Sequence, residues 1–238
     1  MEDKLASIRS EKGGDIAGPE KRTDLLSMFL KSREAHPDIM TETRVLTMAT
    51  SMAFAGSDTT SISLASVFYH LLKEPHCLRE LRKEINAAID AGVIEDRPTG
   101  LISWKESQKL PYLDACIKEA FRVHPAAGLP LERIVPPSGI EICGEWIPGG
   151  TIVGCSAWIL HRRPEVFGQD VEVYRPERWL EASPENVKAM NATMFQFGAG
   201  ARTCIGKNIS LMEIYKLVPG FLRRFEVCGL ISYDYVIC

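Results

Sequence analysis

The run FGAGARTCIG, residues 197–206, constrains this chain more than any other stretch. It has the form F-x-x-G-x-R-x-C-x-G, and Cys204 comes directly before a pattern of helical period. Unpaired N–H groups and the dipole at a helix start favour a thiolate over a thiol. A lone cysteine is usually a small buried hydrophobe, but this framing predicts a soft metal ligand.

The other specified positions suit a flat cofactor beside the sulfur. Gly200 and Gly206 let the backbone approach a planar group where a Cβ would clash. Arg202 offers a forked cation of the kind that pairs with carboxylates. Phe197 can cover the sulfur and keep water away from it. The run therefore predicts a shielded thiolate site that holds a flat, acidic cofactor.

A dinucleotide-binding loop is the alternative interpretation of the same run. Gly198 and Gly200 form G-x-G, but the third glycine of G-x-G-x-x-G would fall on Thr203. The strand that should precede such a loop is also missing from the pattern. This interpretation is therefore rejected.

Composition excludes several classes of protein. The chain has 238 residues, a net charge of −3 and no basic run, which argues against a nucleic-acid partner. Its seven cysteines lack C-x-x-C spacing, which indicates a reducing compartment rather than a disulfide framework or a zinc knuckle. Residues 1–23 are polar, with no signal peptide or membrane anchor, and are expected to be mobile. The most apolar window, about residues 45–72, contains Asp58 and reads as a buried helix rather than a membrane span.

The pattern predicts a mainly α chain with small β-sheets, an α+β fold. A short helix is expected over residues 24–33, followed by a long helix that Thr41 caps and that runs to about Lys73. Further helices are expected at 76–91, after Ser103, from Pro111 to Pro125 and over 205–224. Short β-branched runs and glycine turns predict strands and hairpins within residues 131–155, and another strand begins at 225–227.

A polar cluster interrupts the long helix. Residues 55–60, AGSDTT, are poor helix formers, and they predict a widened or kinked turn. In the functional interpretation the turn makes room for a ligand, and Asp58 and Thr59 handle protons beside it. The alternative is a kinked core helix whose hydroxyl groups are satisfied.

Three further residues have the chemistry of a buried ionic lock. Glu119 and Arg122 are three positions apart on one predicted helix, so they share a face and can pair. Arg178 follows a proline in YRPERW and can supply a second cation to the same carboxylate. The sequence predicts a structural rather than a catalytic role for this triad.

Taken together, these motifs resemble those of the cytochromes P450, the haem-thiolate monooxygenases. Residues 197–206 are similar to the haem-binding loop of that family, residues 55–60 to its A-G-x-[D/E]-T-[S/T] helix motif, and EAFR and PER to its E-x-x-R and P-E-R motifs. The resemblance covers roughly residues 20–227 and only the later part of the family's domain, from the long central helix through the thiolate loop and the following helix. Residues 24–227 are thus identified as the C-terminal part of a haem domain, and 228–238 as an atypical tail.

The resemblance implies roles for individual residues. Cys204 would ligate the iron of haem b, and Ala55, Asp58 and Thr59 would line the oxygen-binding side, where Asp58 feeds protons through water. The positions of Arg133 and His161 imply contacts with the haem propionates, as does that of Arg202. A surface arginine and a structural histidine are the alternatives for the first two. Glu119, Arg122 and Arg178 would lock the meander that carries the thiolate loop.

The resemblance also implies the activity. A full-length relative would insert one oxygen atom from O2 into a small apolar organic substrate, with electrons from an NADPH-dependent reductase, at the cytosolic face of the endoplasmic reticulum. The intact Asp58–Thr59 pair argues against a variant that works without outside electrons. HRRPEVFG and YRPERWLEA resemble filamentous-fungal microsomal members, which suggests secondary metabolism or xenobiotic oxidation. The alternative is a truncated, catalytically inactive fragment that binds haem weakly or not at all.

Overall fold

The structure is a computed structural model that describes residues 24–227. The mobile segment 1–23 and the atypical tail 228–238 expected from the sequence lie outside the described residues. Contacts divide the chain between Ala55 and Gly56 into two compact units, which are described separately. Among the described helices, none combines the length and the apolar character needed to cross a membrane.

The first unit contains helix α2 and the beginning of helix α3. Helix α2 spans Leu25–Ala35, and the carboxylate of Asp24 caps it by accepting the N–H of Ser27 at 2.9 Å. Helix α3 spans Glu42–Lys73, and the hydroxyl of Thr41 accepts the N–H of Arg44 at 3.3 Å, as its N-cap position predicts. The sequence therefore located both helix starts to within a residue.

Helix α3 continues without interruption through the polar cluster. The Ser61 hydroxyl donates to the carbonyl of Asp58 at 2.9 Å, and the Ser63 hydroxyl donates to that of Thr59 at 2.8 Å. These back-bonds occupy hydroxyl groups that would otherwise compete with the helix. The widened turn predicted from the sequence is therefore absent from the described backbone.

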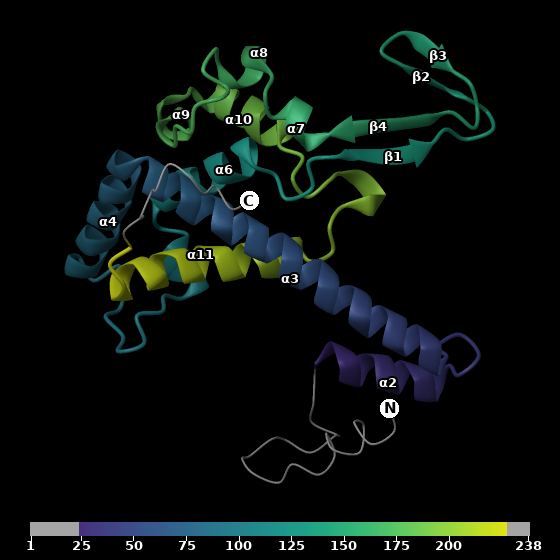
Figure 1. Cartoon of the computed structure of the whole chain (residues 1–238), viewed down its shortest axis with the longest axis horizontal. Coiled ribbons are helices and arrows are strands. Elements are labelled where there is room, and N and C mark those ends of the chain that lie inside the picture. Colours follow the sequence, from purple (N-terminus) through teal and green to yellow (C-terminus); the bar gives the residue numbers. More distant parts are fainter. Residues whose placement is uncertain (1–23, 228–238) are drawn as a thin grey trace, which may run out of the picture. The chain divides into compact units, whose positions relative to one another are not determined.

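Four helices enclose the main core of the second unit: the end of α3, α4 (Pro75–Asp90), α6 (Pro111–Val123) and α11 (Lys207–Arg224). Figure 1 shows α4, α6 and α11 lying together, and contacts between each pair support this arrangement. The short helix α5 (Trp104–Ser107) packs on α11 and begins with a capping box between Ser103 and Glu106. Apolar side chains of helical period fill the core: Val67, Leu71, Leu81, Ile85, Leu113, Ile117, Phe121, Ile214 and Val218.

A side chain from α4 fixes the start of α6. The two carboxylate oxygens of Glu84 accept the N–H groups of Tyr112 at 2.7 Å and Leu113 at 3.0 Å. These are among the unpaired donors at the N-terminus of the helix, where no local side chain caps it. The position of α6, which carries Glu119 and Arg122, is therefore set by tertiary contact.

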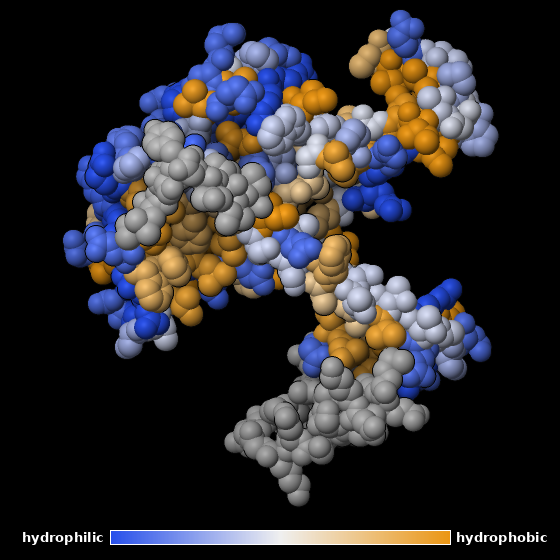
Figure 2. Space-filling view, in the orientation of Figure 1, coloured by the Kyte–Doolittle hydropathy of each residue, from blue (hydrophilic) through white to orange (hydrophobic). Residues whose placement is uncertain are grey.

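The β structure consists of two antiparallel pairs. Strand β1 (Pro130–Ile134) pairs with β4 (Ile152–Ser156), in the register Glu132 to Gly154. Strands β2 (Ile140–Ile142) and β3 (Glu145–Ile147) form a hairpin whose turn residues Cys143 and Gly144 both have positive φ, as a two-residue turn of this twist requires. Figure 2 shows apolar side chains gathered on that hairpin, where Trp146 is exposed. Residues 225–227, expected to begin a strand, are not in one.

Short helices that the sequence did not predict follow β4. They are α7 (Ala157–Leu160), α8 (Pro164–Phe167), α9 (Glu177–Glu181) and α10 (Pro184–Thr193). A second buried cluster forms among them and α6, from Ala115, Phe167, Trp179 and Met190. This cluster holds the segment that carries Arg178 against α6.

Candidate functional site

The cysteine loop closes on one backbone carbonyl. The oxygen of Phe197 accepts the N–H of Cys204 at 2.8 Å and the hydroxyl of Thr203 at 3.3 Å. The Phe197 ring packs edge-on against Phe121 of α6, with centroids 5.6 Å apart. The loop is thus anchored to the core through the residue that opens the motif.

Cys204 itself is exposed at the start of α11. Gly206 is the N-cap of that helix, and Lys207 is its first residue. Within residues 24–227 no group of three or more His, Cys, Asp or Glu side chains is placed to hold a metal ion. A single thiolate suits a metal whose remaining ligands come from a cofactor, as they do in a haem.

The glycines leave open space beside the sulfur. Gly200 has φ of +68°, and a Cβ built on it would meet nothing within 4 Å. A Cβ built on Gly206 would lie 3.8 Å from the sulfur of Cys204, which is its only near neighbour. Neither position is crowded by the protein itself, so the prediction that a flat group lies next to the thiolate stays a prediction.

Two alanine substitutions measure the effect of backbone strain at glycines where an added Cβ would have free space. Gly56, inside helix α3, also has nothing within 4 Å of a built Cβ, but its φ is negative. We expect Gly56→Ala to stabilise the chain by about 0.5–1 kcal/mol, because alanine loses less backbone entropy in a helix. Gly200→Ala should instead destabilise it by about 1 kcal/mol, because its positive φ strains any Cβ. Urea unfolding measures the change in the free energy of unfolding for each variant. Changes in the same direction for both variants would contradict this reasoning.

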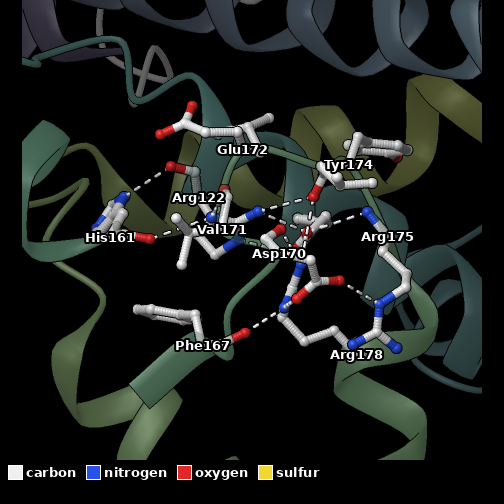
Figure 3. A network of polar contacts seen from close by, with 12 residues as sticks. Arg122, His161, Phe167, Asp170, Val171, Glu172, Tyr174, Arg175 and Arg178 are labelled. Carbon is white, nitrogen blue, oxygen red and sulfur yellow. Dashed lines mark hydrogen bonds and ion pairs between the residues drawn. The ribbon is translucent and has the colours of Figure 1, made fainter. Parts of the chain in front are cut away.

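A buried ionic network surrounds Glu119, and Figure 3 labels several of its members, among them Arg122, Asp170 and Arg178. One carboxylate oxygen accepts Arg122 Nη2 at 2.8 Å and Arg178 Nε at 3.2 Å, together with the backbone N–H of Arg175 at 3.1 Å. The other accepts Arg122 Nε at 2.9 Å and the indole N–H of Trp179 at 2.9 Å. The structure therefore brings together the three residues of the predicted triad.

The two guanidinium groups also bind backbone carbonyls that lie far away in sequence. Arg122 donates to the carbonyls of His161 at 3.1 Å, Val171 at 2.6 Å and Val173 at 3.0 Å. Arg178 donates to the carbonyl of Phe167 and to that of Asp170 at 3.0 Å. These contacts fix the irregular segment between α8 and α9, as expected of a lock on the meander.

Asp170 is a member of this network that the sequence did not reveal. Its carboxylate accepts Arg178 Nη1 at 2.6 Å and Arg175 Nε at 2.8 Å. The hydrogen bond from Arg178 lowers the pKa of Asp170 to about 2. No local motif marks Asp170, because its partners lie five and eight residues further along an irregular segment. For Trp179, the only sequence feature that could have indicated membership in the network is its position directly after the P-E-R motif.

The residues predicted for the oxygen side divide between the two units. Ala55 belongs to the first unit, so its relation to the cysteine loop stays a prediction. Asp58 and Thr59 are exposed on α3 in the second unit. The next residue, Thr60, forms a hydroxyl–hydroxyl hydrogen bond of 3.2 Å with Ser210 of α11. This contact brings the turn of α3 that carries Asp58 and Thr59 close to α11, but the exposed side chains of those two residues lie on other sides of the helix than Thr60.

The predicted propionate partners have different surroundings. Arg133 is exposed on β1, where Nη1 donates to the carbonyl of Glu132 at 2.7 Å, and Arg202 is exposed in the short 3-10 turn η2, Gly200–Arg202. Both remain candidates for carboxylate binding. His161 is fully buried, and both of its ring nitrogens bind backbone groups, those of Arg122 and Phe195. Its propionate role is therefore corrected to the structural alternative.

The residues of the loop fit a haem on its thiolate side. The sulfur is exposed, and the space beside Gly200 and Gly206 is open. Ile205, next to the cysteine, is 82% exposed and offers an apolar surface of the kind a porphyrin face needs. Fold, loop and buried network are together compatible with a protein of the haem-thiolate class.

Comparison with known proteins identifies the family. The family model described as cytochrome P450 matches residues 1–229. The chain therefore belongs to the cytochrome P450 family. The fold agrees with this membership, because it is mainly helical with small antiparallel sheets.

The chain is similar to fungal members of that family. It is 46% identical over 210 residues to a cytochrome P450 monooxygenase of Aspergillus terreus, covering 88% of this chain and 42% of that protein. It is 48% identical over 204 residues to the cytochrome P450 monooxygenase cicH of Emericella nidulans, covering 86% and 40%. A third relative, ACRTS1 of Alternaria alternata, is 44% identical, with coverages of 87% and 54%. The chain thus spans about two fifths to one half of the length of these relatives.

Proposed function

We propose that this chain supplies the thiolate side of a haem-dependent monooxygenase. The observation that carries the proposal is the exposed Cys204, which lies three residues before α11 in a loop closed on the Phe197 carbonyl. When bound, haem b would supply the activation of O2 and its insertion into a substrate. The family membership and the fungal monooxygenase relatives support the same function.

The residues of this chain would hold and orient the group. Cys204 would give its thiolate to the iron, and the open backbone at Gly200 and Gly206 would let the ring approach. Arg133 and Arg202, both exposed cations, would bind the propionates. The Glu119 network would support the loop from a distance, because it fixes the segment between α8 and α9 against α6.

Helix α3 would manage protons near the reacting oxygen. Asp58 is exposed and so able to exchange protons with water, and Thr59 lies beside it on the helix. The Thr60–Ser210 hydrogen bond supports the placement of this turn near α11. Asp58 would deliver protons through water, and the Thr59 hydroxyl would orient that water.

The substrate would be a small apolar organic molecule, and electrons would come from an NADPH-dependent reductase. Relatives named as fungal monooxygenases favour a role in secondary metabolism, with xenobiotic oxidation as the other possibility. The cytosolic face of the endoplasmic reticulum is the location proposed for the full-length protein.

The Cys204→Ser substitution tests this function. Residues 1–238 are expressed with haem, and the reduced protein is mixed with carbon monoxide. We expect the wild-type chain to give a thiolate-type Soret band and Cys204→Ser to lose it completely, because an alcohol does not replace the thiolate. Cys155→Ser is the matched control, since Cys155 is also an exposed cysteine, on β4, and this variant should keep the band.

Two outcomes would contradict the proposal. A band that survives in Cys204→Ser would remove the ligand assignment. A folded wild-type chain that leaves added haem free would favour the alternative of an inactive polypeptide that binds haem weakly or not at all. Circular dichroism of the same samples separates this second outcome from simple misfolding.

A further inference from the structure

His161 occupies an unusual position for a histidine, because it is fully buried and both ring nitrogens are engaged. It follows α7 as its C-cap residue. Nδ1 lies 3.2 Å from the carbonyl oxygen of Arg122, at the end of α6. Nε2 lies 2.7 Å from the backbone nitrogen of Phe195, which leads into the cysteine loop. One ring therefore joins three separate segments of the chain.

The partners fix the protonation state of the ring. A backbone N–H is a donor only, so Nε2 must accept from Phe195 and carry no proton. A carbonyl oxygen is an acceptor only, so Nδ1 must carry the proton and donate to Arg122. The geometry thus requires a neutral imidazole with its hydrogen on Nδ1. A proton added at Nε2 would face the N–H of Phe195 and break that contact.

The ring connects the ionic network to the sulfur by short steps. The guanidinium group of Arg122, which is held by Glu119, donates to the carbonyl of His161 at 3.1 Å, so the two residues bind each other in both directions. Phe195 in turn accepts the N–H of Gly198 at 2.9 Å, and the Phe197 carbonyl accepts the N–H of Cys204 at 2.8 Å. His161 thus links the ionic network to the loop at Phe195, in addition to the ring contact between Phe121 and Phe197.

We propose that His161 is a positioning residue of the Cys204 loop, and that its neutral imidazole anchors the loop at Phe195 and releases it on protonation. The proposal concerns how firmly the Cys204 loop is held in place. It rests on the proposed function only for the identity of the group that the Cys204 sulfur binds.

The charges around the ring oppose its protonation. Arg122 from α6 and Arg162, the next residue in the chain, are the charged groups that face it, and both disfavour a second positive charge. The third segment, at Phe195, contributes a backbone N–H rather than a charge. Burial, the largest cause, lowers the pKa of His161 to about 4. The anchor therefore holds at neutral pH and weakens as the medium becomes acidic.

Hydrogen exchange of the haem-free full chain tests the proposal, with peptides that cover residues 195–204. His161→Phe keeps a ring of similar size but leaves the N–H of Phe195 without an acceptor. We expect exchange in this segment to speed up about tenfold at pH 7 relative to α6 in the same sample. His161→Gln keeps an acceptor and a donor, and should restore most of the protection. His70→Phe is the control, because His70 is a partly buried histidine that stacks on Tyr174, with centroids 4.8 Å apart.

A pH series makes the test independent of whether His161→Phe folds. In the wild type, protection of residues 195–204, corrected for intrinsic exchange rates, should fall between pH 7 and 5 more than that of α6. In His161→Gln, which cannot titrate, the ratio should stay constant. The proposal is overturned by equal pH profiles for these two proteins, or by unchanged exchange of this segment in a folded His161→Phe. Both results are independent of the haem spectrum that tests Cys204.

Discussion

Glu119→Gln is expected to cost the chain about 3–5 kcal/mol of unfolding free energy, the range measured when one partner of a buried ion pair is removed. Because small domains are stable by only about 5–15 kcal/mol, this change should remove a large share of the total stability. Urea unfolding monitored by circular dichroism measures the loss.

The physical reason is the number of donors that Glu119 serves. Its side chain is fully buried and accepts from two guanidinium groups, an indole N–H and a backbone N–H. Glutamine has the same shape but no charge, and its amide presents hydrogens toward Arg122 or Trp179. The buried guanidinium group of Arg122 would then lack its counter-charge, and Arg178 would keep only Asp170, which is far more costly than losing an exposed pair.

Glu172→Gln is the matched control. Glu172 accepts from Arg162 Nε with both oxygens, at 3.1 and 3.2 Å, but its side chain is 71% exposed. Water replaces the lost contact there, so the cost should stay below about 1 kcal/mol. A Glu119→Gln variant no less stable than Glu172→Gln would mean that the network does not hold the fold.

The sequence predicted those structural elements that are determined by residues close together in the chain. Thr41 and Ser103 lie at helix starts, Pro111 is the first residue of α6, and all of these signals act within one helical turn. Glu119 and Arg122 could be paired because their spacing of three places them on one face. The cysteine loop could be recognised because its glycines, arginine and cysteine are specified within a few residues.

The features of the fold and the site that the sequence did not predict depend on contacts between segments far apart in the chain. The ring of His161 meets Phe195, and Asp170 meets Arg178 in an irregular segment where no period relates them. The polar cluster of α3 predicts a widened or kinked turn from propensity, but α3 is a continuous α-helix there, and nearby serine hydroxyls are satisfied by its own carbonyls. Single-sequence patterns contain none of this tertiary information, and the resemblance that implies a propionate contact for His161 does not supply it either.

Acid should destabilise the folded chain between pH 6.5 and 4 through two histidines. Burial lowers the pKa of both His70 and His161 to about 4, from an ordinary value of 6.5. The stabilisation from the two neutral histidines is complete above pH 6.5, where they are unprotonated in both the folded and the unfolded chain. Below pH 6.5 the histidines of the unfolded chain bind protons, whereas those of the folded chain stay neutral. The free energy of unfolding therefore falls with each pH unit until about pH 4.

The size of this loss follows from the shift. One buried histidine changes the unfolding free energy by about 1.4 kcal/mol per pH unit, or roughly 3 kcal/mol over the window for His161. His70 should contribute less, because it is partly exposed and solvent screens its charge. Asp170 acts mainly below this window, because its stabilisation is lost as the pH falls from its ordinary pKa of 3.8 to its folded-state pKa of about 2.

Urea unfolding at half-unit steps from pH 7.5 to about pH 4 checks this expectation. His161→Gln should be less stable than the wild type at pH 7 but lose less stability on acidification, so the two curves converge toward pH 4. The Glu172→Gln variant should follow the wild-type slope, because its carboxylate is exposed. Parallel curves for the wild type and His161→Gln would show that His161 titrates alike in both states, which its burial and its contact with Phe195 do not allow.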